Sequence, residues 1–397
     1  SDLVTGVQTC ALPISLKEEI QMNRMTSLAA IAATSLSLTS QVPAFAADEE
    51  QAAPIERIVV HGYFRAQGIE DVPASVSVLQ QDDIQQRNAE HLEHALAMAP
   101  NVNLASGASR GRFFQIRGVG ERSQFVDPIN PSVGLVIDGI NYSSLGAAGT
   151  LFDIGQVEVF RGPQTTRFGA DGMAGVIYLG STAIGDDRNG IAELSVANYN
   201  SYGAGVAASH RFSDAFAGRV SLYQYASDGF TKNKFLGRDD TQSQNELTLR
   251  INSNWYINEN WQADFTYHRF DIDNGYDAWS LDQDRTTLSD QPGRDTLDSH
   301  AARAKLTFNG AEAYSAEFSL SGLTADSIYD FDEDWAYEGI RPGWEYNSFD
   351  QYLRDRSQVE AEVRMLSKQP LMLFGRPTDW LAGAYWQQRE QGLTRNY

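Results

Sequence analysis

The sequence predicts an α+β domain followed by an incomplete antiparallel transmembrane β-barrel. Two observations favour this fold class. Residues 72–186 mix short strands with short helices and glycine-rich turns, whereas residues 187–397 alternate apolar and polar side chains along long segments. Such alternation is typical of strands that face lipid on one side and a wet or filled interior on the other. No apolar run reaches the roughly 18 residues that a membrane-spanning helix needs, which excludes a helical membrane protein.

Charge and aromatic content narrow the function classes. The 397 residues carry a net charge of −21, which argues against a nucleic-acid binder because phosphate contacts need a basic face. An acidic surface either attracts cations and cationic ligands or keeps the protein soluble, and composition leaves both open. The aromatic fraction of 11% suits strands and membrane interfaces.

Two segments at the N-terminus are set apart from the fold. Residues 1–21 contain a stretch, Val4 to Ile14, that resembles the translation of a sequencing adapter, and we interpret them as an artefact. Residues 22–46 have a positive start, an apolar core and the cleavage signal Ala44-Phe45-Ala46, which predict a signal peptide and export. The single cysteine, Cys10, lies in the artefact, so disulfides, thiolate metal sites and a cysteine nucleophile are excluded.

Residues 47–71 predict a flexible acidic tail with a short β-prone run, Glu56-Arg57-Ile58-Val59-Val60. A run of this kind on a flexible tail could be lent to another protein as an added strand. Residues 72–186 predict a compact domain of ordinary size. Its expected strands are 76–79, 113–117, 133–137 and 157–160, and its expected helices begin at Gln81 and span Glu90 to Met98.

Residues 187–397 predict about nine long strands, as a tilted bilayer crossing requires. Their expected ranges are 190–199, 202–212, 215–227, 244–256, 259–271, 299–309, 312–325, 353–367 and 378–392. Long connections at 228–243, 272–298 and 326–352 alternate with shorter ones, which is typical of outer-membrane barrels with long external loops. A secreted β-sandwich or solenoid is the alternative on this pattern alone.

Three motifs occur in order within residues 72–186, and a glycine-rich turn follows the third. They are Phe114-Gln115-Ile116-Arg117-Gly118, Val136-Ile137-Asp138-Gly139 and Val157-Glu158-Val159-Phe160-Arg161-Gly162-Pro163, with Phe168-Gly169 after them. This series resembles the plug domain of TonB-dependent outer-membrane receptors, and the resemblance covers about residues 56–392. The motif residues are therefore Arg117, Gly118, Asp138, Gly139, Glu158, Arg161, Gly162, Pro163 and Gly169. The sequence departs from the family at Gln164-Thr165-Thr166-Arg167, where small residues are usual.

The resemblance implies an architecture and a function. It implies a barrel of about 22 strands, of which this chain would supply about nine, so we expect a fragment that is inactive alone. It identifies Glu56, Arg57, Ile58, Val59 and Val60 as the TonB box, which the inner-membrane TonB protein would pair with and pull. The implied function is TonB-energised uptake through the outer membrane of a Gram-negative cell, in contact with its lipid, with a ferric siderophore as the expected cargo. It implies neither catalysis nor a cofactor.

Two further groups of residues are candidate sites. We expect the plug arginines Arg117 and Arg161 to pair with inward carboxylates of the barrel, Glu360 and Glu362, as contacts that can be re-sorted when the plug moves. Ordinary surface salt bridges are the alternative. The connection at 326–352 holds residues that could grip an iron chelate or Ca²⁺, namely Tyr329, Asp332, Asp334, Trp335 and Trp344. We favour the alternative, an acidic loop that packs on its neighbours.

A helical metal site and two other functions are weaker hypotheses. His91 and His94 are expected on one helix face, and we interpret them as solvated side chains rather than metal ligands. A signal-transducing receptor of the same architecture would carry an extra periplasmic domain, whereas only residues 47–55 lie between the predicted cleavage site and the TonB box. A soluble secreted β-rich binding protein or hydrolase is the third class, although no spacing singles out a catalytic group.

Overall fold

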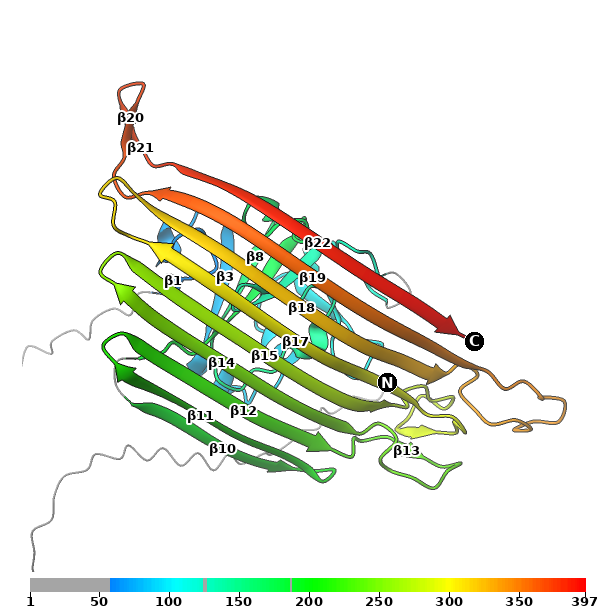
Figure 1. The fold of residues 1–397 in the computed structure, drawn as a ribbon. Helices are drawn as coiled ribbons and strands as arrows, with labels where there is room; N and C mark the ends of the chain where they lie inside the picture. Colours follow the sequence, from blue (N-terminus) through cyan, green and yellow to red (C-terminus); the bar gives the residue numbers. More distant parts are fainter. Residues whose placement is uncertain (1–57, 124–126, 186–187) are drawn as a thin grey trace, which may run out of the picture.

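The computed structural model describes residues 58–123, 127–185 and 188–397. They form an α+β domain and a large antiparallel sheet that follows it in the chain (Figure 1). The predicted artefact, the signal peptide, the acidic tail, Glu56 and Arg57 lie outside the described residues, so the interpretations made of them stay predictions.

The large sheet is a meander of nine antiparallel strands that pair in the order in which they follow one another. The strands are β10 (Asn189–Ala197), β11 (Ser201–Ser213), β12 (Phe216–Ser227), β14 (Gln244–Asn258), β15 (Trp261–Tyr276), β17 (Gly293–Phe308), β18 (Tyr314–Asp332), β19 (Phe349–Ser367) and β22 (Leu381–Asn396). Each of the nine ranges predicted from alternation overlaps one of these strands, which confirms that part of the fold class.

Several strands extend beyond their predicted ranges, and the largest extensions lie at the end of the sheet with the long connections. β15 continues to Tyr276 and β18 to Asp332, while β17 starts at Gly293 and β19 at Phe349. A small buried aromatic core supports this extension, formed by Tyr276, Tyr329, Phe331 and Tyr352. Apolar alternation fades there because the exposed positions carry charged side chains, such as Asp273, Arg294 and Asp326, so the pattern assigned these residues to loops.

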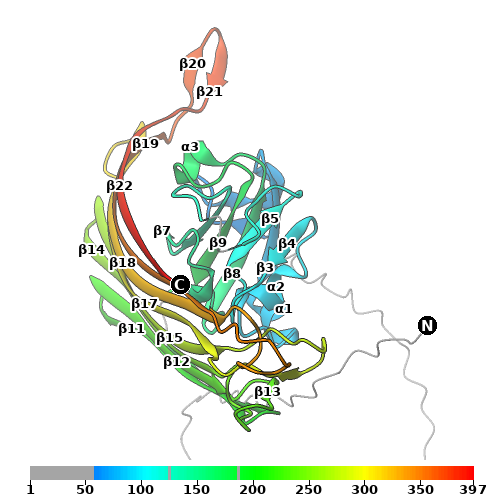
Figure 2. The ribbon, with the colours of Figure 1, turned by 90° about the vertical axis from the view of Figure 1, so that its right-hand side faces the viewer.

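Short elements lie in the connections. At the long-loop end, β13 (Lys232–Asn233) pairs in parallel with β16 (Thr286–Thr287). At the short-turn end, β20 (Leu371–Leu373) and β21 (Arg376–Thr378) form a hairpin that projects beyond the sheet (Figure 2).

The α+β domain is built on a five-stranded sheet in the order β3-β8-β9-β6-β7. These strands are β3 (Ser75–Gln80), β8 (Ile154–Arg161), β9 (Gly175–Ser181), β6 (Val133–Ile137) and β7 (Ile140–Asn141). Two strand pairs and three short helices complete it: β1 (Val59–Val60) with β2 (Gln67–Gly68), β4 (Val102–Ala105) with β5 (Phe113–Ile116), and α1 (Gln81–Gln86), α2 (Leu92–Leu96) and α3 (Thr165–Phe168). The short 3-10 helices are η1 (Ile69–Asp71) and η2 (Gly146–Ala148). Within the described residues, no helix has the length and apolarity to cross a membrane.

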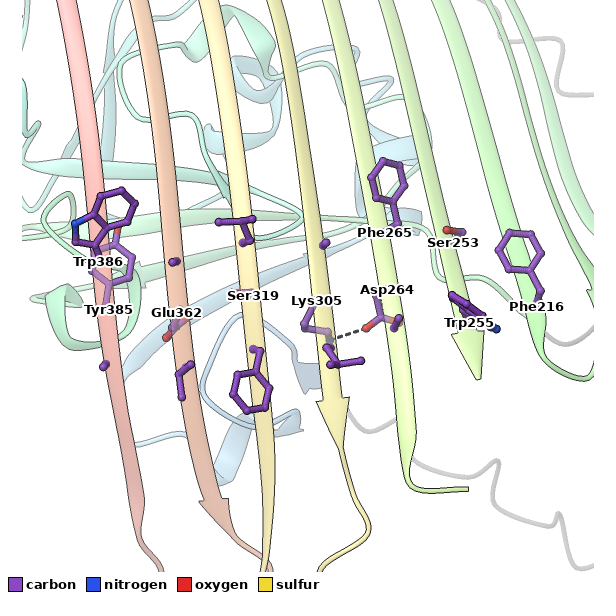
Figure 3. A pocket seen from close by; sticks show the side chains of 18 residues that line it. Phe216, Ser253, Trp255, Asp264, Phe265, Lys305, Ser319, Glu362, Tyr385 and Trp386 are labelled. Atoms are coloured by element: carbon purple, nitrogen blue, oxygen red, sulfur yellow. Dashed lines mark ion pairs between the residues drawn. The ribbon is translucent and has the colours of Figure 1, made fainter. Parts of the chain in front are cut away.

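The outer face of the large sheet is apolar. Along β18, Phe318 and Leu320 are 42% and 56% exposed, whereas Ser321 and Leu323, the next residues of the opposite face, are buried. A shallow hollow of about 590 Å³ crosses this outer face, and Figure 3 looks onto it with the α+β domain behind the sheet. Phe216, Trp255, Phe265 and Trp386, labelled in Figure 3, line it together with other apolar side chains such as Phe318 and Leu320. A continuous apolar face of this kind suits contact with lipid.

The α+β domain lies against the concave side of the large sheet (Figure 2). The two bodies share one core cluster, in which Tyr142 and Ile140 of the domain join Phe270, Leu297 and Leu323 of the sheet. The expectation of a strongly polar inner face is therefore wrong in this region. Polar residues alternate with apolar ones on the inner wall, because the centre of the domain is buried against it and needs dry contacts.

Candidate functional site

Two of the sequence motifs are tight turns of one type. Arg117 and Gly118 have φ angles of 54° and 81°, and Asp138 and Gly139 have φ angles of 50° and 81°. Ile116 and Val119 exchange two backbone hydrogen bonds across the first turn, at 2.9 and 3.1 Å. Two positive φ angles define a type I′ hairpin turn, which requires glycine at the second position and tolerates aspartate at the first.

Asp138 joins the α+β domain to the sheet. Its carboxylate accepts hydrogen bonds from the backbone N–H and the hydroxyl of Ser181, at 2.7 and 2.6 Å, and lies 3.0 Å from Nε2 of His268 on β15. Arg303 on β17 donates to its backbone carbonyl at 3.2 Å. Burial alone would raise the pKa of Asp138, but the bonds from His268 and Ser181 outweigh burial and hold it at about 2. The turn is therefore an anionic contact point on the wall.

Five more charge pairs link the domain to the wall, and most place the carboxylate on the domain. Asp153 accepts two bonds from Arg219, and Asp171 accepts from Arg389; all four side chains are 3% exposed or less. The other pairs are Asp127–Arg354 at 3.2 Å, Arg110–Glu246 at 2.6 Å and Arg112–Asp295 at 3.5 Å. The sequence interpretation missed this set, although arginines at inward positions of a predicted strand, such as Arg219, could have indicated it.

The predicted pairing of plug arginines with Glu360 and Glu362 is corrected. Arg161 donates instead to Ser75, to Ser77 and to the carbonyl of Pro100, all within its own domain. Glu360 does reach the domain, but its partner is the amide of Asn141 at 3.3 Å, and Glu362 pairs with Arg364. Arg161 is the last residue of β8 and lies beside β3. Its guanidinium therefore donates to the nearby hydroxyls of that strand rather than to the more distant carboxylates of the wall.

The remaining motif residues shape close approaches. Gly169, at a φ of 80°, faces Tyr385 of β22, and an added Cβ would lie 2.8 Å from that ring. Gly162 also has a positive φ, 106°, and Pro163 after it is exposed. Glycine at 169 therefore lets the domain approach the wall.

The segment predicted as the TonB box is docked on the domain from Ile58 onward. Val60 is fully buried in a cluster with Phe160 and Val176. Arg65, a few residues later, donates to the hydroxyl of Ser367 at 3.0 Å, and Ser367 is the last residue of β19 at the short-turn end. The segment thus lies at the end of the sheet opposite the long loops.

The predicted ligand loop divides into organising and exposed residues. Tyr329 is fully buried, and Asp332 and Asp334 accept backbone N–H groups of their own loop, at 3.0 to 3.2 Å. Trp335 stacks on Trp279 with ring centres 4.9 Å apart. Trp335 and Trp344 are 36% and 44% exposed, so these two remain available to a ligand whereas the carboxylates organise the loop.

The two histidines do not share a helix face. α2 begins at Leu92, and His91 precedes it as a buried N-cap whose Nδ1 accepts from the N–H of Glu93 at 3.4 Å. Burial lowers the pKa of His91 to about 4. His94 is an exposed residue of the helix. In the part of the chain that the structure describes, no group of three or more His, Cys, Asp or Glu side chains is arranged to hold a metal.

These features define a class of fold: an α+β domain that lies against the concave side of an antiparallel wall with an apolar outer face. Comparisons with known proteins agree. Residues 68–176 match the family model of the TonB-dependent Receptor Plug Domain. The chain therefore contains a plug domain of the TonB-dependent receptor type, followed by a nine-stranded antiparallel wall. We call the α+β domain the plug from here on.

Individual relatives cover different parts of the chain. The vitamin B12 transporter BtuB of Vibrio vulnificus is 24% identical over 63% of this chain and 39% of its own length. The pesticin receptor of Yersinia enterocolitica is 30% identical over 36% of this chain and 21% of its own. The crystal structure of the ferric yersiniabactin uptake receptor FyuA from Yersinia pestis superposes with a TM-score of 0.67 at 19% identity, covering 81% of this chain and 49% of that one. The chain thus spans about two fifths to half of the length of BtuB and FyuA.

Proposed function

We propose that the protein acts in TonB-energised uptake of a scarce extracellular ligand, with a ferric siderophore as the cargo. The observation that carries this proposal is that the two ends of the strands differ. Long loops with exposed aromatic residues lie at one end, and the docked segment after residue 57 lies at the other, held to Ser367 by Arg65. A ligand would bind at the first end and TonB at the second.

The loop end offers a binding surface with contributions from both bodies. Ser109 of the plug donates to Asp295 of β17 through its N–H and hydroxyl, at 2.8 and 2.7 Å. Arg110 binds Glu246 of β14 in the same region. A ligand that contacts this surface could therefore shift a plug loop and two strands of the wall together. Trp335 and Trp344 supply exposed rings nearby in the chain's long connection.

The choice of an iron chelate rests on what the relatives are named for. FyuA is a receptor for ferric yersiniabactin, and another solved relative, BauA of Acinetobacter baumannii, is a receptor for ferric preacinetobactin. Both superpose over more than four fifths of this chain, at 19% and 15% identity, so they support the architecture and suggest the cargo class. Vitamin B12 is the competing cargo because BtuB proteins are among the sequence relatives.

A growth assay tests the proposal. The full-length gene that contains this sequence is deleted from its host, and growth is measured under iron limitation on a panel of ferric siderophores, and separately on vitamin B12 as a limiting nutrient. We expect loss of growth on at least one ferric siderophore, restored by the gene and abolished again without TonB. Loss of vitamin B12 use alone would replace the cargo, and unchanged growth on every compound would refute the proposed function.

A further inference from the structure

The residues after the predicted TonB box lie in a fitted site on the plug. Val60 is fully buried, Tyr63 stacks on Phe160 with ring centres 6.5 Å apart, and Phe64 lies under the guanidinium of Arg167 at 5.8 Å. Backbone pairing of β1 with β2 closes the segment into a small hairpin. The segment is therefore bound through side chains, rings and backbone together.

One carboxylate binds the backbone of this segment. Oε1 of Glu158 accepts the N–H of His61 at 2.6 Å, and Oε2 accepts the N–H of Gly62 at 2.8 Å. Gln156, two residues earlier on β8, donates its amide both to Glu158 and to the carbonyl of Val59, each at 2.8 Å. Three of the four backbone positions from 59 to 62 are thus held by two side chains of one strand, Val60 being the exception.

The docked segment in turn stabilises the buried carboxylate of Glu158. Its side chain is fully buried, and within the described residues no arginine, lysine or histidine forms an ion pair with it. Burial raises the pKa of Glu158, and the backbone N–H groups of His61 and Gly62 are the main groups that oppose this rise. Bonds of this charge-assisted kind are about twice as strong as neutral ones.

The TonB box cannot be docked on the plug and paired with TonB at the same time. A partner that adds a strand needs free backbone groups along the segment it takes. Within the box the carbonyl of Val59 is occupied and the other edge of β1 is paired with β2, while the N–H groups of His61 and Gly62 anchor the two residues that follow the box. Release from Glu158 and Gln156 must therefore accompany capture by TonB.

We propose that Glu158 is the positioning residue that keeps residues 58–62 docked on the plug and so limits the delivery of the TonB box to TonB. We call this docked arrangement the stowed state. The proposal rests on the proposed function for the identity of the partner, but not for the stowed state itself. It gives the glutamate of the third motif a role other than pairing with the wall, because its hydrogen-bond partners among the described residues are His61, Gly62 and Gln156, all in the N-terminal part of the chain.

Gly62 offers an independent way to perturb the same contact. A Cβ at this position would lie 2.8 Å from Oε2 of Glu158 and 3.0 Å from ring atoms of Phe160 and Tyr178. Because all three neighbours belong to the plug sheet, Gly62→Ala should push the segment off its site while leaving the carboxylate in place. It complements Glu158→Gln, which keeps the size of the side chain and removes its charge and one acceptor.

Hydrogen exchange followed by mass spectrometry on the purified, ligand-free receptor tests the stowed state. In both Glu158→Gln and Gly62→Ala we expect the peptide covering residues 58–68 to exchange at least tenfold faster, equivalent to about 1.4 kcal/mol. Peptides from β6 and β9 should be unchanged. Asp82→Asn, an exposed carboxylate in the first turn of α1, is the matched control and should leave all exchange rates as they are.

Binding of the periplasmic domain of TonB to the same variants supplies the second readout. We expect both variants to bind TonB without ligand at least tenfold more tightly than the native receptor does. Unchanged exchange at residues 58–68 in both variants would overturn the proposal, as would faster exchange without tighter TonB binding. If Glu158→Gln unfolds the plug, the result for Gly62→Ala alone decides whether the proposal holds. Failure of every form, native included, to bind TonB would refute the proposed function while the exchange result still judges the stowed state.

Discussion

The buried pair of Asp153 and Arg219 should hold the plug in its place on the wall. Arg219 on β12 donates through Nε at 2.9 Å and through Nη2 to the two carboxylate oxygens of Asp153, and both side chains are 3% exposed or less. Replacing Asp153 by Asn leaves the guanidinium buried with half its acceptors. Asn suits the perturbation because Asp153 has a φ of 60°, a conformation that Asn tolerates.

The expected cost follows from this geometry. Removing one partner of a buried pair typically destabilises by about 3–5 kcal/mol, because a charge is left uncompensated in a dry site. Nη1 of Arg219 already lacks a hydrogen-bond partner within the described residues, so little else can take over. A loss of this size corresponds to roughly a hundredfold to a few thousandfold more frequent opening of the plug. Asp153→Asn combined with Arg219→Gln should recover a large part of it, since a neutral amide pair remains.

Hydrogen exchange of the β8 and β9 amides measures the opening free energy in the native receptor, both single variants and the double variant. We expect each single variant to lose at least 3 kcal/mol and the double variant to lose clearly less than the sum. Additive losses would show that the two groups do not stabilise one another. Losses below about 1 kcal/mol would show that the pair is wet, as an exposed salt bridge is.

Two further predictions concern the plug. Since burial lowers the pKa of His91 to about 4, the unfolded state binds a proton there between pH 6.5 and 4 that the folded state does not. The unfolding free energy should therefore fall as pH falls through this window, by at most about 1.4 kcal/mol per pH unit. His91→Asn keeps a capping acceptor and should reduce this dependence of the unfolding free energy on pH, measured by denaturant titrations. An equal pH dependence in the variant would contradict this. Gly139→Ala should destabilise the plug by about 1–2 kcal/mol in thermal unfolding, because alanine would be held at a φ of 81° and its Cβ would displace the guanidinium of Arg303, 2.6 Å away. Gly237→Ala, with a φ of 64° and open space around it, isolates the backbone strain, and equal losses in the two variants would exclude the clash.

Local periodicity predicted the sheet well. The alternation in β18 and β19 indicated which residues face outward because lipid imposes one requirement on every outward position. The motif glycines indicated turns, since Gly118 and Gly139 are needed at positive φ whatever surrounds them. These are properties that neighbouring residues in the chain decide.

Contacts between the plug and the wall could not be predicted in the same way. Arg161 and Glu362 have opposite charges and suitable positions in their motifs, yet Ser75 and Ser77 on the adjacent strand reach Arg161 first. The pairing of Asp153 with Arg219 depends on how the plug is turned inside the sheet, which no local pattern encodes. Glu158 likewise has the same sequence neighbours whether it faces solvent, the wall or the segment at residues 61 and 62.

The central claim is that lipid touches one face of the large sheet and the plug touches the other. A nitroxide scan of single cysteine variants from Phe318 to Ala325 on β18 tests it most directly, with collisions measured against oxygen, which concentrates in lipid, in the receptor reconstituted in bilayers. Oxygen accessibility should alternate, high at Phe318, Leu320 and Gly322 and low at Ser319, Ser321 and Leu323. Uniform accessibility, or maxima at the serines, would contradict the account.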